Sequence, residues 1–186
     1  MIELNNATLA RAGKTILEHL SLMLPDRGAV ALLGPSGSGK TTLLMLFAGL
    51  LSPAAGGFTG MEGKRVAVVF QEDRLLPWLT AKENVALADG VRSVEECLEL
   101  TELSGDAGKH PRALSGGMQR RVAIARALRF GGDAVVLDEP FKGLDAELRE
   151  RIAGRLASSF PLIFIATHDE KEAALLGDYT AVRLGG

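Results

Sequence analysis

Short, almost wholly apolar runs recur along the chain, and segments with helical spacing lie between them. The runs cover residues 28–33, 65–70, 134–137 and 161–166, and each is followed by a glycine or a polar residue. A strand that is apolar throughout is buried on both faces, which is typical of a parallel sheet covered by helices. The order of the elements therefore predicts an α/β fold with a mainly parallel sheet.

The remaining pattern adds a small antiparallel β part at the N-terminus and several helices. Residues 2–9 alternate loosely between apolar and polar positions, residues 16–24 form a candidate second strand, and residues 179–184 a last one. The Gly-rich stretch 54–63 is expected to be a connection. Helical spacing occurs in five ranges: 42–51, 80–87, 93–103, 118–128 and 146–156.

One domain with a helical insertion accounts for this order. The chain has 186 residues, of which 47% are hydrophobic and 24% charged, so it can bury a full core. We expect a core of about residues 1–79 and 131–186, and a helical subdomain of about residues 80–130. Helix starts are predicted by three pairs with the spacing of a capping box: Thr80 and Glu83, Ser93 and Glu96, and Asp169 and Glu172.

Charge and cysteine content narrow the class of function. The formal net charge is −2 and the pI about 6.0, which argues against nucleic-acid binding as the main function. We expect Arg120, Arg121 and Arg126 to form a solvated helix face rather than a track for phosphates. The single cysteine, Cys97, excludes an internal disulfide, fits a reducing compartment and is expected to be a small hydrophobic residue on a helix.

No leader or membrane span is visible in the sequence. The first six residues lack the basic start and apolar core of a signal peptide. The longest apolar run, residues 43–51, is much shorter than the roughly 20 residues that a membrane span needs. We therefore expect a cytoplasmic protein, whose membrane role must come through a partner.

A glycine-rich loop lies between the run at 28–33 and the helix expected at 42–51. It fits the pattern G-x-x-x-x-G-K-[ST] of nucleotide-binding loops with Gly34, Pro35, Ser36, Gly37, Ser38, Gly39, Lys40 and Thr41. Glycines let main-chain N–H groups face a polyphosphate, and the positive end of the next helix favours the same anion. Lys40 then reaches the β- and γ-phosphates, and the Thr41 hydroxyl ligates Mg²⁺. A flexible Gly-Ser linker is the alternative.

A second glycine pair opens the helix expected at 118–128. Residues 114–119 read Leu-Ser-Gly-Gly-Met-Gln, in which Ser115, Gly116 and Gly117 offer a hydroxyl and free N–H groups to an anion. An ordinary helix cap is the alternative interpretation. The motif lies about twenty residues before an apolar strand that ends in Asp-Glu.

Two carboxylates end the apolar strand at 134–137. Asp138 and Glu139 emerge at the carboxyl edge of the predicted sheet, where ligands bind in open α/β folds. Asp138 is placed to hold Mg²⁺, and Glu139 to polarise an attacking water as general base. The alternative, two solvated carboxylates before a proline turn, is disfavoured because a phosphate site is already predicted nearby.

In motif order and approximate spacing, the chain from about residue 3 onward resembles the ATP-binding cassette ATPases, the motor subunits of ABC transporters. Residues 114–118 resemble the family signature LSGGQ, with Met118 in place of Gln. The resemblance implies a P-loop NTPase fold, ATP and Mg²⁺ as cofactors, and a second cassette whose Ser115, Gly116 and Gly117 complete the ATP site in trans. It adds Thr42 to the ATP contacts.

The same resemblance gives roles to two residues that follow strands. Gln71 is similar to the family glutamine that senses Mg²⁺ and the attacking water and links the site to the membrane partner. His168 is similar to the switch histidine, which implies a contact with the γ-phosphate. Either side chain alone, at the end of a strand, would be unremarkable.

Two departures from the family pattern concern the ATP site. The family often has an aromatic residue that stacks on adenine, but here that place falls at Arg11, and residues 1–46 hold no aromatic side chain. A guanidinium can stack on a base instead. Residues 142–145 read Lys-Gly-Leu-Asp where Ser-Ala-Leu-Asp is commoner, so Lys142 adds charge at an expected dimer contact and Asp145 is kept.

The stretch 70–80, Phe-Gln-Glu-Asp-Arg-Leu-Leu-Pro-Trp-Leu-Thr, is similar to the importer ATPases for nitrate, sulfonates, taurine and thiamine precursors. Exposed Leu75, Leu76 and Trp78 would suit a groove that receives a permease, and packing inside the helical subdomain is the alternative for the leucines. We expect an ATP-hydrolysing subunit, peripheral on the inner face of the cell membrane, that works with a second copy, permease subunits and, through them, an extracytoplasmic solute-binding protein.

Two other functions stay open from the sequence. A cassette ATPase acting in nucleic-acid repair or translation is disfavoured by the charge and by the lack of a basic arm. A P-loop kinase for a small molecule would leave the signature residues and His168 without a role.

Overall fold

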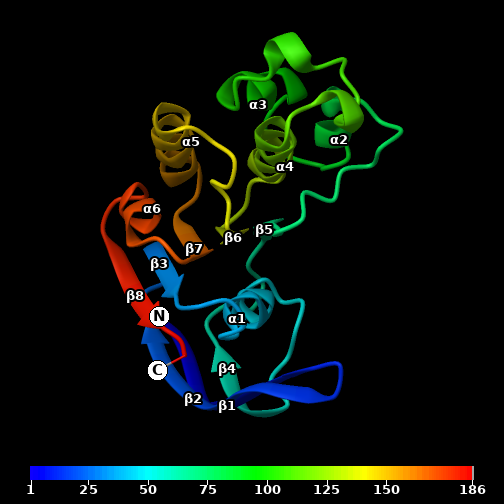
Figure 1. Cartoon of the computed structure of the whole chain (residues 1–186). Coiled ribbons are helices and arrows are strands. Elements are labelled where there is room, and N and C mark those ends of the chain that lie inside the picture. The colour runs from blue at the N-terminus through cyan, green and yellow to red at the C-terminus, as the bar shows by residue number, and fades with distance from the viewer. Residues whose placement is uncertain (186) are drawn as a thin grey trace.

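The buried apolar runs form one five-stranded sheet in the order β5-β6-β7-β3-β8. A computed structural model describes residues 1–185 (Figure 1). The strands are β3 (Gly28–Leu33), β5 (Val66–Val69), β6 (Ala134–Asp138), β7 (Leu162–Thr167) and β8 (Tyr179–Arg183). All four neighbouring pairs are parallel, so the prediction of a mainly parallel sheet is confirmed.

A second, antiparallel sheet has the order β2-β1-β4, formed by β1 (Ile2–Arg11), β2 (Lys14–Leu24) and β4 (Ala55–Thr59). The expectation that 54–63 is only a connection was wrong, because β4 lies within it. A Cβ at Gly56 would collide with the carbonyl of Asn6 on β1. Glycine here permits close strand pairing rather than a flexible turn.

Within residues 1–185, six α-helices connect or flank the strands: α1 (Lys40–Phe47), α2 (Ala81–Ala86), α3 (Val94–Leu100), α4 (Gly116–Phe130), α5 (Ala146–Ser159) and α6 (Glu170–Ala174). Two short 3₁₀ turns, η1 (Ser104–Asp106) and η2 (Pro111–Ala113), precede α4. Helix α1 is shorter than the range predicted for it. None of the described helices, within residues 1–185, has the length and apolar character that crossing a bilayer requires.

The predicted capping boxes were right at one helix and incomplete at two. Thr80 and Glu83 form both reciprocal bonds at the start of α2. Ser93 accepts the Glu96 amide at the start of α3. At α6 the Asp169 carboxylate accepts the Lys171 amide, while the carboxylate of Glu172, the predicted partner of Asp169, accepts the Thr167 hydroxyl instead at 2.7 Å.

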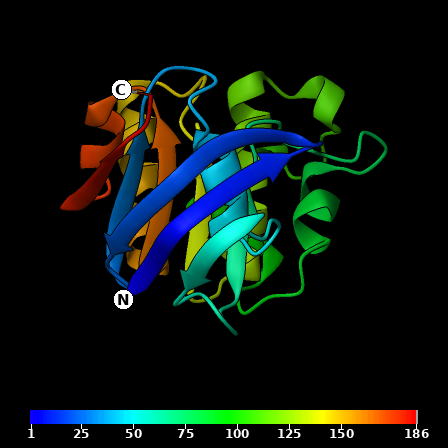
Figure 2. The same cartoon turned by 90° about the horizontal axis from the view of Figure 1, so that it is seen from below.

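The parallel sheet separates two hydrophobic clusters. One face packs against α1 and the antiparallel sheet, and the other against α4, α5 and α6 (Figures 1 and 2). The ring of Phe47 on α1 stacks on that of Phe164 on β7, with centroids 4.2 Å apart. Cys97 is fully buried in the other cluster, as predicted, and burial raises the pKa of its thiol to about 11.

Replacing Phe47, which stacks on Phe164, should lower the stability of the protein without affecting the site. Phe47→Leu keeps an apolar side chain but loses the aromatic pair, so we expect the free energy of unfolding to fall by about 1 kcal/mol. Urea unfolding followed by circular dichroism measures this. Leu50→Ala, at a side chain 57% exposed, is the control and should change the free energy by less. Equal effects would contradict the stacking argument.

Candidate nucleotide-binding site

The glycine-rich loop joins the end of β3 to the start of α1, as the sequence predicts. Gly39 caps the helix in the left-handed conformation, at φ 97°, and Lys40 is its first residue. Lys40 is 8% exposed as a residue, and its ammonium donates to the carbonyls of Gly34 at 2.6 Å and Pro35 at 2.8 Å. Ser38 Oγ is buried and has no hydrogen-bond partner among the described residues. A buried hydroxyl without a partner at a helix N-terminus fits an anionic ligand.

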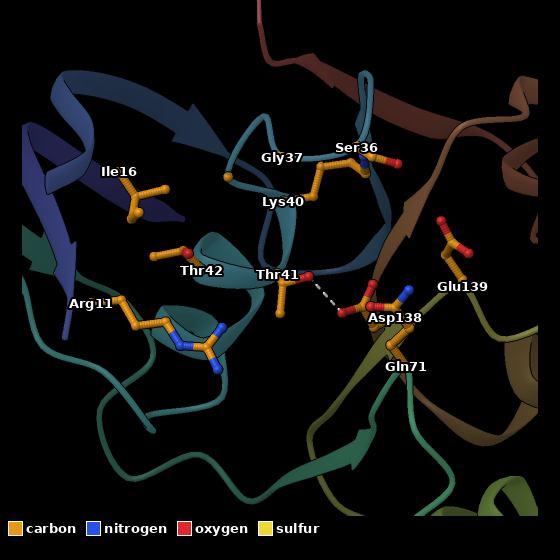
Figure 3. Close-up of a pocket in the computed structure, with 11 residues that line it drawn as sticks. Arg11, Ile16, Ser36, Gly37, Lys40, Thr41, Thr42, Gln71, Asp138 and Glu139 are labelled. Atoms are coloured by element: carbon orange, nitrogen blue, oxygen red, sulfur yellow. Dashed lines mark hydrogen bonds between the residues drawn. The ribbon is translucent and has the colours of Figure 1, made fainter. Parts of the chain in front are cut away.

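A cavity of about 300 Å³ opens beside this loop (Figure 3). Its walls come from the loop, the tip of the β1–β2 hairpin and the carboxyl ends of β5 and β6. The lining residues are Arg11, Ile16, Ser36, Gly37, Gly39, Lys40, Thr41, Thr42, Gln71, Asp138 and Glu139. The fold therefore brings together residues up to 128 positions apart (139 minus 11) that the sequence singled out, except Ile16, which it missed.

Thr41 and Asp138 face each other across the floor of the cavity. The Thr41 hydroxyl donates to Asp138 Oδ2 at 2.8 Å (Figure 3). Burial raises the pKa of the Asp138 carboxyl, with a smaller increase from Glu139, and the Thr41 bond acts in the opposite direction. A hydroxyl, a carboxylate and the Gln71 amide form an all-oxygen donor set, which fits Mg²⁺, a cation that uses few protein ligands together with phosphate oxygens.

Glu139 has a strained backbone at the carboxyl edge of the sheet. Its φ is 46°, a conformation that non-glycine residues adopt rarely and at a cost of about 1–3 kcal/mol. Its amide donates to the Ala166 carbonyl at 3.0 Å, which holds the turn in place. The carboxylate lies 3.7 Å from Nδ1 of His168, whose side chain is 74% exposed. This turn aims a half-buried carboxylate at the space beside the loop.

A second hollow continues from the cavity past Glu139 and His168. Its lining also includes Ser36 and Gln71, which line the first cavity. Lys142, where the family more often has Ser, lines it as well. The predicted catalytic residues Glu139, Gln71 and His168 therefore surround one continuous space next to the loop.

Within one chain, Ser115, Gly116 and Gly117 do not line this cavity. Ser115 caps α4 by accepting the Met118 amide at 3.2 Å. A Cβ on Gly117 would collide with the carbonyl oxygen of Gly143, so the start of α4 rests on the turn at 142–145. Asp145 in that turn caps α5 by accepting the Leu148 amide at 2.9 Å.

Gly117→Ala should strain this contact. The added methyl group must displace the turn at Gly143, so we expect the free energy of unfolding to fall by about 1–3 kcal/mol. Gly154→Ala on α5 is the matched control, because its Cβ meets nothing within 4 Å. It should stabilise the protein by about 0.4–1 kcal/mol. Urea unfolding of both variants distinguishes a collision from a general loss of glycine.

The expectation that three arginines of α4 form a solvated face was wrong. Arg120 is only 4% exposed, and its guanidinium donates to the carbonyls of Phe70 and Gln71. Arg121 donates to the carbonyls of Thr101 and Glu102. Arg126 also bonds main-chain carbonyls of the segment after β5. Sequence reasoning missed these roles because the carbonyl partners lie about 20 to 50 residues away.

The family model described as "ABC transporter" matches residues 17–142. The aliphatic sulfonates import ATP-binding protein SsuB 1 of Pseudomonas savastanoi pv. phaseolicola is 43% identical, over 93% of this chain and 76% of its own length. The taurine import ATP-binding protein TauB of Rhizobium johnstonii is 40% identical, over 98% of this chain and 79% of its own. A solved dimeric structure of the ATP-binding cassette MJ0796, bound to ADP and Pi, has a TM-score of 0.85 and 29% identity, covering 100% of this chain and 97% of that one.

The fold and the site thus define a P-loop nucleotide-binding protein. The chain belongs to the ABC transporter family, as an ATP-binding cassette.

Proposed function

We propose that this protein is the ATP-hydrolysing motor subunit of an importer for a sulfonate or a related small anion. The observation that best supports hydrolysis is the strained turn at Glu139, which directs a carboxylate at the space beside the loop that holds Lys40. The relatives SsuB 1 and TauB are import proteins for aliphatic sulfonates and for taurine, which supports the class of solute.

In this proposal the loop from Gly34 to Thr42 binds the triphosphate, and Thr41, Asp138 and Gln71 would hold Mg²⁺. Bound there, the metal would neutralise charge on the β- and γ-phosphates. Glu139 accepts a proton from the attacking water, and His168, 3.7 Å from it, contacts the γ-phosphate. The catalytic part is the core of about 1–79 and 131–186, and the subdomain of about 80–130 carries the signature residues.

Two copies of the chain would close around two nucleotides. In this proposal Ser115, Gly116 and Gly117 of each copy complete the site of the other. They do not line the cavity of their own chain, and the solved cassette MJ0796 is a dimer. ATP favours the closed pair, and its hydrolysis reopens the pair, since a ligand shifts an equilibrium only through different affinities for the two states. Residues 70–80 face the permease, and Trp78, 69% exposed, is the apolar contact there.

A transport assay with the permease and the solute-binding protein tests this function. Purified protein should hydrolyse Mg-ATP, dimerise in ATP and co-purify with a membrane permease on the inner face of the membrane. Vesicles should then take up a sulfonate when the permease is in their membrane, this protein and ATP are inside, and the solute-binding protein is outside. Co-purification with ribosomes or DNA instead would favour the alternative, a cassette ATPase in translation or repair.

Arg11 should give this site a weak preference among bases. The Arg11 side chain lines the cavity with Ile16, and the lining holds no aromatic side chain. A guanidinium stacks on any base, so we expect the affinities for ATP and GTP to agree within about threefold. Arg11→Ala should weaken both by about fivefold. Lys14→Ala, at the paired position across the hairpin, is the control. Displacement of a fluorescent nucleotide measures all of these, and strong discrimination against GTP would contradict the role of Arg11.

A further inference from the structure

Two arginines of α4 hold the main chain of the segment after β5. Arg120 donates to the carbonyls of Phe70 and Gln71, and its Nε lies 3.1 Å from Asp73 Oδ1. Arg126 donates to the carbonyls of Asp73 at 2.9 Å and Arg74 at 3.0 Å. We call Arg120 and Arg126 the guanidinium clamp. Because the acceptors are main-chain atoms, the clamp fixes the path of the chain rather than one side chain.

The next residues of the same segment are held by α2. Asn84, fully buried, accepts the Leu76 amide at 2.8 Å. Its amide group donates to the carbonyls of Leu76, Leu79 and Thr80. The sheet pairing of β5 with β6 ends at Val69. The segment 70–80, although it continues a core strand, is therefore bonded mainly to the helices of the 80–130 region.

The chemistry of these contacts favours a rigid link between α4 and the segment. A guanidinium presents its donors in a fixed planar fork, and charge-assisted bonds are about twice as strong as neutral ones. Burial raises the pKa of the Asp73 carboxyl and lowers that of the Arg126 guanidinium, while the opposite charges partly offset both shifts. Arg120 is only 4% exposed, so losing the partners of its guanidinium would leave a buried charge unpaired, which costs free energy.

We propose that the guanidinium clamp makes segment 70–80 move with α4, so that Gln71 and Trp78 follow the signature residues at the start of the same helix. Helix α4 runs from Gly116 to Phe130, so one helix joins the signature to both arginines. The inference rests on the proposed function, in which Ser115–Gly117 contact the nucleotide of the partner copy. Each copy's permease-facing segment would then respond to ATP held by the other copy. Arg120 and Arg126 are positioning residues that act through Gln71 and Trp78.

Energy transfer from Trp78 measures this movement directly. Trp78 is the only tryptophan, and the only native cysteine, Cys97, is buried with a pKa of about 11, so an added exposed cysteine takes the label. A dansyl acceptor at Leu50→Cys reports the distance from the segment to the core. An acceptor at Val91→Cys, a side chain 78% exposed in the helical region, reports the distance to the helices. Both are measured with Glu139→Gln, with and without Mg-ATP.

With the clamp intact, ATP should change the transfer to position 50 and leave the transfer to position 91 constant. Arg120→Lys removes the planar fork but keeps the charge, so we expect the change at position 50 to fall by at least about half and a change to arise at position 91. Arg121→Lys is the matched control, because Arg121 bonds Thr101 and Glu102 rather than segment 70–80. It should behave like the unaltered protein.

Hydrolysis gives a second readout with Glu139 restored. Arg120→Lys should lower kcat about tenfold and change KM for ATP by less than about twofold, because it misplaces Gln71 and leaves the phosphate loop intact. Should Arg120→Lys melt early, Arg126→Lys, at a half-buried position, makes the same test. Equal transfer changes in the clamp variants and Arg121→Lys would overturn the inference. Failure of the Glu139→Gln protein itself to dimerise in ATP would instead overturn the proposed function.

Discussion

Glu139→Gln should abolish most ATP hydrolysis and trap a dimer that contains ATP. The amide has the shape of the carboxylate but cannot accept a proton from water, and general-base catalysis contributes about 10²–10⁴-fold. We therefore expect the turnover rate to fall by about that factor. Because the Thr41–Asp138 pair and Lys40 are unchanged, nucleotide affinity should stay within a few-fold of the original. Phosphate release and gel filtration in Mg-ATP measure both effects.

Glu147→Gln is the control for this variant. Glu147 lies in the first turn of α5, and its side chain is 90% exposed. Its carboxylate forms a long ion pair with Arg151, with 3.8 Å between Oε2 and Nη1. Its turnover rate should be unchanged, since surface pairs of this kind contribute little. If Glu139→Gln keeps a rate within a few-fold of the original, the base is another group. If hydrolysis stops but ATP forms no dimer, the two-copy cycle is wrong.

Lys40→Ala should prevent tight binding of nucleotide. Lys40 places its ammonium over the loop, held by the carbonyls of Gly34 and Pro35, so a bound triphosphate meets a buried cation. Charge-assisted hydrogen bonds contribute about 1.5–3 kcal/mol each, so the loss of one or two should weaken ATP binding by about 100-fold or more. Titration calorimetry with Mg-ATP measures the affinity.

Lys82→Ala is the matched control for the charge alone. Lys82 on α2 is 55% exposed and pairs with Glu95 at 2.7 Å, away from the cavity lining. Its removal should leave the ATP affinity unchanged. A Lys40→Ala protein that binds ATP within about fivefold of the original would show that the loop N–H groups alone hold the triphosphate.

Several features could be predicted from the sequence because they depend on neighbours along the chain. The apolar runs predicted the parallel sheet, the loop from Gly34 to Thr41 predicted a strand–loop–helix unit, and Thr80 with Glu83 predicted the start of α2. Each follows from backbone conformation or burial within a few residues. Strand β4 was missed because its glycines resemble a loop until β1 is placed beside them.

The sequence by itself predicted which residues would carry the chemistry: the loop lysine, the carboxylates after β6 and the glycines before α4. Only the tertiary structure decided how they meet. It alone set the left-handed turn at Glu139 and the contact of Gly117 with Gly143, and it turned Arg120 from an apparent surface charge into a buried clamp. The physical reason is that main-chain carbonyls are present in every residue and leave no mark in a sequence. Which of them a distant guanidinium finds depends on the packing of α4 against β5 and the segment that follows it.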